Sequence, residues 1–175
     1  MDIFYFILII SERCPICREI CDAYSQIASS LSLDNKIPNS NIANLIGNYM
    51  GKRTINKYTN CACGYFGNAI EEKMFYTTPD YLVLDLDEGR KVDFDYEIDL
   101  SEYIETNKCP RKYQLYAVIN KKIINNSNLL FFCSIKENGR WTYYSLNNIK
   151  KCGTEFLKEG IPSLAIYKKI VNVII

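Results

Sequence analysis

Hydrophobic periodicity predicts one clear helix in the first third of the chain. Its apolar residues recur at the spacing of a single helix face: Ile42, Leu45, Ile46, Tyr49 and Met50. Ser40 or Asn39 is expected to cap the start of this helix, and Gly51, which tolerates a positive φ, is expected to end it. We therefore expect a helix near residues 40–51.

The remaining pattern is typical of strands. Apolar, aromatic and β-branched runs predict strands over residues 3–10, 69–76, 81–86, 92–98, 113–120, 129–136, 141–146 and 163–173. Residues 18–34 fit a helix or a strand by pattern, and their Leu-Ser-Leu end favours a strand. Polar turns over residues 125–128 and 137–140 separate the later runs. The predicted fold class is α+β, a mostly antiparallel sheet with one or two helices.

Length and composition predict one folded domain spanning residues 1–175, because 48% of the residues are apolar and 23% are charged. The formal charge of +1, from 21 basic and 20 acidic residues, creates no global field that favours nucleic acid or an anionic membrane. The apolar run 3–10 is far shorter than the roughly 20 residues that span a bilayer, and its flanks lack the features of a signal peptide. We expect no membrane association and an intracellular location, cytoplasmic or nuclear.

Two close cysteine pairs predict a metal site. Cys14 and Cys17 form the knuckle Cys-Pro-Ile-Cys, while Cys61 and Cys63 are separated by one residue and followed by Gly64, which helps a tight turn to close. Four thiolates suit tetrahedral zinc, so we expect a structural zinc ion on Cys14, Cys17, Cys61 and Cys63. Cys21 is a spare candidate ligand. The chain contains no histidine, so any zinc site here is sulfur-rich or uses a carboxylate.

Other interpretations of the eight cysteines remain open at this point. In a secreted protein an even number of cysteines indicates disulfides, and the close pairs also fit core cysteines without a metal. Cys109, Cys133 and Cys152 are isolated, and we expect them to serve as small buried apolar residues.

Taken in order, these segments resemble the fingers and palm of the ubiquitin-specific protease (ubiquitin carboxyl-terminal hydrolase) family. The resemblance rests on CPIC, NCACG, PDYLVLDL, DFDYEIDLSEY, YQLYAVIN, LLFFCSIK and SLAIYKK, which follow one another along nearly the whole chain. It implies zinc-ribbon-like fingers over about residues 1–80, including the helix, and a palm over about residues 79–175.

Departures from the family pattern predict a truncated and catalytically degenerate member. The family carries its nucleophile in a cysteine box on a thumb subdomain that precedes the fingers, and this sequence has no such box. The general base of the family falls at about Leu130, and the residue that orients the base falls at Asn147 or Asn148. Because acyl transfer needs a thiolate and a base, we expect a pseudoenzyme with no catalytic residues.

The main functional hypothesis is a non-catalytic scaffold or interaction subunit of a larger protein or ribonucleoprotein assembly, with an exposed apolar palm face that needs a partner. Alternatives are a ubiquitin-binding module, an enzyme completed by another chain, and an unrelated α+β protein. A further alternative is a ribosome- or RNA-complex-associated factor. Direct RNA contact would use dispersed basic residues: Lys52, Arg53, Lys57, Arg111, Lys112, Lys121, Lys122, Lys150, Lys151, Lys168 and Lys169.

Overall fold

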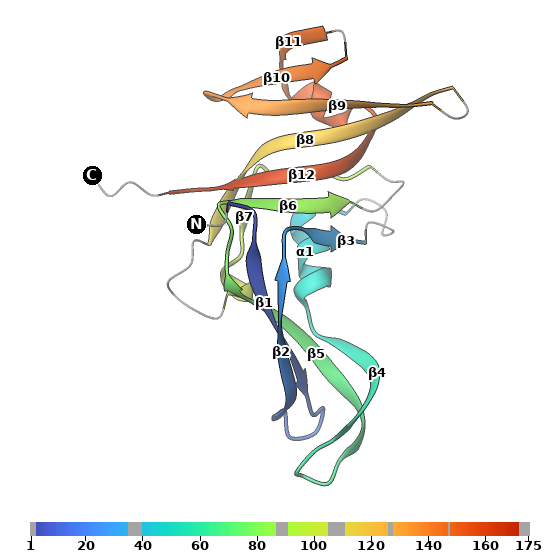
Figure 1. Ribbon diagram of the computed structural model, residues 1–175, viewed down its shortest axis with the longest axis vertical. Coiled ribbons are helices and arrows are strands. Elements are labelled where there is room, and N and C mark those ends of the chain that lie inside the picture. Colours follow the sequence, from blue (N-terminus) through green and yellow to red (C-terminus); the bar gives the residue numbers. More distant parts are fainter. Residues whose placement is uncertain are drawn as a thin grey trace.

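Two β-sheets and one α-helix make up the part of the chain that the computed structural model describes, residues 3–34, 40–86, 91–104, 111–125, 128–146 and 148–171. The sheets follow one another along the long axis of the molecule, and helix α1 lies where they meet (Figure 1). No helix in these described ranges is long and apolar enough to cross a membrane.

The smaller sheet has the order β2 (Ile20–Ala28), β1 (Phe6–Arg13), β5 (Phe66–Thr77), β4 (Arg53–Asn60), and every neighbouring pair is antiparallel. It therefore consists of two hairpins, β1–β2 and β4–β5, joined side by side through β1 and β5. The sheet projects away from the rest of the molecule as the lower half of Figure 1.

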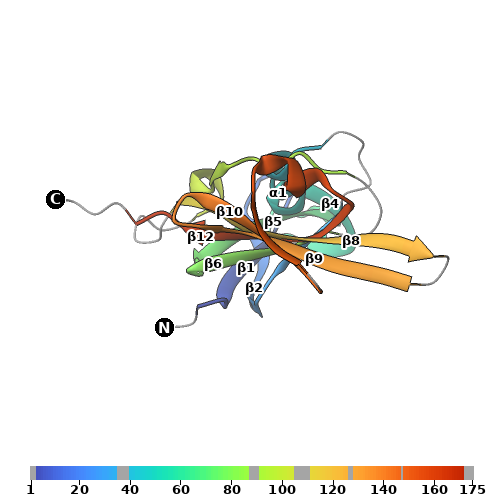
Figure 2. The ribbon, with the colours of Figure 1, turned by 90° about the horizontal axis from the view of Figure 1, so that it is seen from above.

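The larger sheet has the order β11 (Asn148–Cys152), β10 (Arg140–Ser145), β9 (Asn128–Glu137), β8 (Lys112–Asn125), β12 (Ile161–Lys169), β6 (Tyr81–Leu86), β3 (Leu31–Leu33). An eighth strand, β7 (Glu97–Asp99), pairs with β8. Only the β3–β6 pair among these described strands is parallel. The β8–β9 hairpin extends well beyond the other elements (Figure 2). The predicted fold class, mostly antiparallel sheet with a helix, is confirmed.

Helix α1 (Ile42–Met50) lies where periodicity placed it, but its ends differ from the prediction. Its N-cap is Asn41, whose side-chain oxygen accepts a hydrogen bond from the Asn44 N–H at 2.9 Å, so Ser40 is not the cap; Asn39 lies outside the described residues. Gly51 ends the helix with a φ of −64° rather than a positive φ. A glycine is needed there because a Cβ would lie 2.6 Å from the Gly47 carbonyl oxygen.

A single hydrophobic core joins the helix to both sheets. Phe6, Leu8 and Phe75 of the smaller sheet belong to the same buried cluster as Leu82 and Leu84 of the larger one. The buried residues of α1 complete this cluster: Ile42, Leu45, Ile46 and Met50. Two short 3-10 helices, η1 (Ser101–Tyr103) and η2 (Thr154–Lys158), lie in the connections of the larger sheet.

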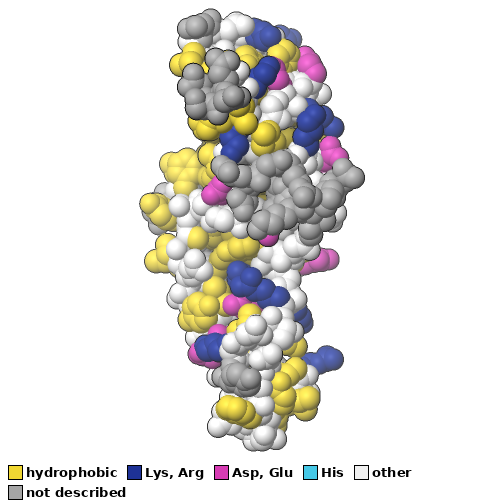
Figure 3. Space-filling model, turned by 90° about the vertical axis from the view of Figure 1, so that its right-hand side faces the viewer, with side chains coloured by type: hydrophobic (Ala, Val, Ile, Leu, Met, Phe, Trp, Pro, Cys, Tyr) yellow, Lys and Arg dark blue, Asp and Glu magenta, His cyan; other side chains and the backbone are white. Residues whose placement is uncertain are grey.

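The surface that carries β3 and β4 is mixed in character. Basic and acidic side chains are interspersed along this side of the molecule, and hydrophobic side chains reach the surface in several places (Figure 3). This distribution agrees with the near balance of 21 basic and 20 acidic residues.

Candidate metal centre

Two hairpin turns bring four cysteines together at the outer end of the smaller sheet. Cys14 and Cys17 lie in the β1–β2 turn, and Cys61 and Cys63 lie in the β4–β5 turn. These turns meet because β1 and β5 are adjacent and antiparallel, with Arg13 at the end of β1 opposite Ile70 near the start of β5.

The four sulfur atoms have the spacing of a tetrahedral thiolate site. Cys14 Sγ lies 3.7 Å from Cys63 Sγ, and Cys17 Sγ lies 3.4 Å from Cys61 Sγ. All four sulfurs lie within 4.8 Å of one another. Zinc bound to four sulfurs at about 2.3 Å holds them roughly 3.8 Å apart, so the donor set fits this ion. A disulfide needs sulfurs about 2.05 Å apart, far closer than either pair.

The two turns reach this arrangement through similar backbone conformations. In the first, the Arg18 N–H donates to the Cys14 carbonyl at 2.9 Å, and Arg18 itself has a φ of 65°. In the second, the Gly64 N–H donates to the Cys61 carbonyl at 2.9 Å, and Gly64 has a φ of 87°. The residue after the second cysteine is therefore left-handed in both turns. Because the two turns share this geometry, Cys61 and Cys63 reach the same site as Cys14 and Cys17 although one residue fewer separates them.

Each turn contributes one buried and one exposed cysteine. Cys14 and Cys61 are buried, whereas Cys17 and Cys63 are open to solvent. Burial disfavours the Cys14 thiolate, but backbone N–H groups of Cys17 and Ile16 outweigh this effect and lower the pKa of Cys14 to about 7. The Ile16 N–H lies 3.4 Å from the Cys14 sulfur.

The other described cysteines lie outside this cluster. Cys21 is on β2, where its thiol faces the Glu19 carbonyl at 3.8 Å. Cys133 and Cys152 are on β9 and β11 of the larger sheet, and Cys109 lies outside the described residues. All seven described cysteines are free thiols.

A network of charged side chains crosses the smaller sheet between the cysteine cluster and the core. Lys57 of β4 bonds to Glu12 of β1 at 2.8 Å and to Asp22 of β2 at 3.3 Å. Arg53 bonds to the buried Glu71 at 2.6 Å. The hydrogen bonds to Glu12 and Asp22 raise the pKa of Lys57. The sequence pattern did not reveal this network, because its partners meet only through the register of four strands.

One carboxylate oxygen of this network lacks a hydrogen-bond partner among the residues that the structure describes. The Glu12 side chain is 4% exposed, and its second carboxylate oxygen makes no hydrogen bond with the described residues. Lys57 therefore supplies the main compensation for a nearly buried negative charge.

Two of the residues that the sequence resemblance aligned with the family's base and orienting position lie on the larger sheet. Leu130 is a half-buried residue of β9, opposite Lys122 of β8. Asn148 is an exposed residue of β11, opposite Ser145 of β10. Asn147 lies outside the described residues. A leucine side chain has no group that accepts a proton.

One surface of the larger sheet is unusually apolar. The pairs Ile123–Leu129, Ile119–Cys133, Cys133–Tyr144 and Tyr144–Ile149 run across four neighbouring strands, so these side chains share a face. Leu146 is 84% exposed, Ile149 70% and Phe131 53%. We call this surface the apolar face. Its apolar members are Ile119, Ile123, Leu129, Phe131, Cys133, Tyr144, Leu146 and Ile149, and Lys121, opposite Phe131, lies among them.

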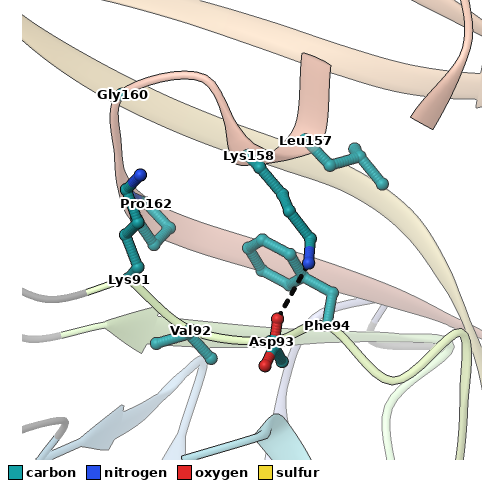
Figure 4. A pocket seen from close by; sticks show the side chains of 8 residues that line it. All are labelled: Lys91, Val92, Asp93, Phe94, Leu157, Lys158, Gly160 and Pro162. Atoms are coloured by element: carbon teal, nitrogen blue, oxygen red, sulfur yellow. Dashed lines mark hydrogen bonds and ion pairs between the residues drawn. The ribbon is translucent and has the colours of Figure 1, made fainter. Parts of the chain in front are cut away.

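A separate hollow lies between η2 and the segment after β6 (Figure 4). Its apolar lining consists of Val92, Phe94, Leu157 and Pro162. Lys158 pairs with Asp93 across it at 3.0 Å. The eight residues that line it carry no thiol, hydroxyl or imidazole group. Its ionisable groups are the amines of Lys91 and Lys158 and the carboxylate of Asp93.

Comparison with known proteins gives a family and a group of similar structures. A family model described as ubiquitin carboxyl-terminal hydrolase matches residues 1–168. The SAGA DUB module containing a Ubp8 variant, Sgf11, Sus1 and Sgf73, bound to monoubiquitin, matches with a TM-score of 0.84 and 20% identity, over 97% of this chain and 41% of that chain. No curated protein matches the sequence significantly.

Two further structures show the same likeness. The Ubp8/Sgf11/Sus1/Sgf73 module bound to ubiquitin aldehyde has a TM-score of 0.84 and 19% identity, over 97% of this chain and 42% of that chain. The yeast SAGA DUB module with an Sgf73 variant has a TM-score of 0.79 and 19% identity, with the same coverage of 97% and 42%. The chain thus spans about two fifths of the length of the solved chains that it matches, and at this identity the likeness shows a shared fold.

Proposed function

Because the chain belongs to the ubiquitin carboxyl-terminal hydrolase family, we propose that it is a non-catalytic member that serves as an interaction subunit of a larger intracellular assembly. The observation that carries this proposal is the apolar face on the same sheet in which the base position holds Leu130.

The non-catalytic part of the proposal rests on side-chain chemistry. Thiol-dependent acyl transfer needs a base that takes the proton of the nucleophile and later returns it to the leaving group. The sequence contains no histidine, and the residue expected at the base position is Leu130, which lies on β9. The amide of Asn148 therefore has no imidazole to orient.

The interaction part rests on the exposed area. Soluble monomers rarely expose a contiguous apolar surface that spans several strands, and such surfaces usually mark a binding partner. The apolar face combines Phe131 and Tyr144 with branched aliphatic residues, a composition that suits the centre of a protein interface. Its solved relatives lie in complexes of Ubp8 with Sgf11, Sus1 and Sgf73, which supports an assembly without naming the partners of this chain.

For the metal centre, we propose one zinc ion bound by Cys14, Cys17, Cys61 and Cys63. Its role is structural, because four protein thiolates fill the tetrahedral shell and leave no position for a substrate. The ion ties the two hairpins of the smaller sheet together at their outer end. We further propose that residues 1–80 and 79–175 correspond to the fingers and palm of the family.

The decisive experiment is native affinity purification from the source cells, with particle size and co-purifying proteins determined together. The expected result is a stoichiometric particle much larger than the 20.3 kDa chain. A free monomer would overturn the assembly proposal. If RNA co-purifies in stoichiometric amounts, the assembly is a ribonucleoprotein rather than a protein complex.

The same purified material tests the absence of catalysis. A ubiquitin–fluorophore reporter is expected to remain uncleaved in its presence. Hydrolysis that disappears when Asn148 is replaced by alanine would show instead that another chain completes an active site here.

A ubiquitin-binding module is the second candidate function, favoured by the two matched structures that contain ubiquitin or ubiquitin aldehyde. Calorimetric titration of the protein with ubiquitin tests this second candidate directly. A lack of binding up to about 0.5 mM ubiquitin, a concentration that still reveals millimolar affinity, would remove this candidate.

A further inference from the structure

Two adjoining hollows form a groove at the end of the larger sheet where β6 begins and β12 ends, on the left of Figure 1. One encloses about 380 Å³ and the other about 290 Å³. Lys168 lines both, because on β12 it lies opposite Tyr81 of β6 and Gln114 of β8. We call this surface the Tyr81–Tyr116 groove; its other polar residues include Lys136 and Asn138.

Two aromatic rings, Tyr81 and Tyr116, line the groove, and Phe4 packs against the first of them. The ring centroids of Tyr81 and Tyr116 are 5.4 Å apart with an interplanar angle of 67°, and those of Phe4 and Tyr81 are 5.9 Å apart with an angle of 42°. Phe4 is 45% exposed, and both tyrosines are half-buried. Rings that remain accessible in this way offer flat surfaces on which other planar groups stack.

The groove also carries positive charge that is not compensated. Lys168 Nζ lies 5.6 Å from the Tyr81 ring centroid and 6.0 Å from that of Tyr116. Among the described residues, neither Lys136 nor Lys168 pairs with a carboxylate, whereas Lys169 is paired with Asp80 at 2.9 Å. Of the three lysines that line the groove, Lys136 and Lys168 therefore have no carboxylate partner within the described part of the chain.

We propose that the Tyr81–Tyr116 groove binds single-stranded nucleic acid, with phosphates at Lys136 and Lys168 and bases stacked on the tyrosine rings. A simple anion would need the two cations but no row of rings, whereas a single strand presents both a phosphate chain and planar bases. The amide groups of Gln114 and Asn138 add hydrogen-bonding capacity for base edges. The groove lies on the larger sheet, whereas the cysteine cluster lies at the outer end of the smaller sheet, and the proposal does not depend on the function proposed above.

Fluorescence anisotropy with a short labelled oligouridine tests this assignment, and inorganic polyphosphate serves as a probe that has charge but no bases. Oligouridine is expected to bind more tightly than polyphosphate. Replacing both lysines, Lys136→Gln with Lys168→Gln, should weaken binding at least about tenfold and reduce the salt slope by about 1.4, since each phosphate contact on a single strand contributes about 0.7.

Separate variants test the contribution of the tyrosine rings to oligouridine binding. Tyr116→Ala should weaken oligouridine binding about tenfold, and Tyr116→Phe, which keeps the ring, should retain it. The matched control removes two exposed lysines elsewhere on the same sheet, Lys122→Gln with Lys151→Gln, and should bind as the unmodified protein does. Thermal melting confirms that each variant is folded.

Three results would overturn the proposal. The first is an absence of oligouridine binding at low salt. The second is equal affinity for polyphosphate together with an unaffected Tyr116→Ala variant, which would identify a plain anion site of the kind that a phosphopeptide also fits. The third is an equal loss of affinity in the Lys122 and Lys151 control, which would indicate unspecific attraction to surface charge.

Discussion

At the scale of single residues, the cysteine cluster makes the sharpest prediction. Cys61→Ser is expected to abolish stoichiometric zinc binding, because a neutral hydroxyl is a poor replacement for a thiolate ligand. The variant should also melt at a lower temperature and lose its response to chelators. Elemental analysis of the purified protein, combined with thermal melting with and without chelator, measures both effects.

Cys21→Ser is the matched control for this prediction. Cys21 lies on a strand next to the first turn, and its sulfur is not part of the cluster. Zinc content and melting temperature should therefore remain unchanged in this variant. A loss of zinc equal to that of Cys61→Ser, or an unmodified protein that retains no zinc, would contradict the proposed ligand set.

The sequence predicted the four cysteines as a group because the short spacings within the pairs Cys14–Cys17 and Cys61–Cys63 can be read directly from it. It could not show how the turns reach the same geometry. Gly64 suits a φ of 87°, but Arg18 adopts a φ of 65° without any signal in its side chain. The contact between Lys57 and Glu12 was also unpredictable, because it depends on the order β2-β1-β5-β4 and on the strand register.

At the scale of elements, the cap of α1 gives a quantitative prediction. Asn41→Ala removes the side-chain oxygen that accepts from the Asn44 N–H, and it should cost about 1 kcal/mol of stability. Urea unfolding measures the change. Asn44→Ala, at an exposed position inside the same helix, should leave stability equal or slightly higher because alanine favours a helix. Equal losses in both variants would refute the capping role.

The charged network that ties β1, β2 and β4 together gives a second prediction at this scale. Lys57→Met should lower stability markedly, because it leaves the nearly buried Glu12 carboxylate without its cation. Lys52→Met is the control, since its partner Glu72 also bonds to Arg13 at 3.0 Å. The urea concentration at the unfolding midpoint should be highest for the unmodified protein, lower for Lys52→Met and lowest for Lys57→Met. A midpoint for Lys52→Met below that of Lys57→Met would contradict this account.

Strand prediction succeeded where apolar residues alternate over a whole element, as in Tyr81–Leu86. It failed where pairing with neighbouring strands determines which residues form the strand. The first strand was predicted over residues 3–10 but spans Phe6–Arg13, because Ser11 and Glu12 are buried by pairing with β2 and β5. Of the strand predicted over 92–98, only Glu97 and Ile98 belong to a strand, β7, which ends at Asp99. Polar β4 and β11 were missed, since their exposed residues carry no apolar pattern.

At the scale of the whole molecule, the apolar face should govern assembly rather than folding. Phe131→Asp with Leu146→Asp places two charges on exposed positions, so the isolated chain should melt as before. The same variant should co-purify with far fewer partners, because a buried unpaired charge opposes association. Native purification followed by quantitative mass spectrometry measures the loss.

Ile27→Asp is the control for this variant, because Ile27 is 72% exposed on β2 of the smaller sheet, away from the apolar face. It should preserve the assembly. If the double variant still assembles normally, the apolar face is not the surface that holds the partners. If the isolated variant fails to fold, the face serves folding rather than assembly.

The path of the chain between the two sheets limits how the protein can be divided. After β2 the chain enters the larger sheet to form β3, passes through α1 and returns to the smaller sheet as β4, before β5 leads into β6. The four strands of the smaller sheet are therefore not one uninterrupted stretch of polypeptide. A graft that moves the cysteine-bearing hairpins to another protein would have to carry β3 and α1 along or replace them with a new linker, so recombination is expected to transfer this region only as a whole.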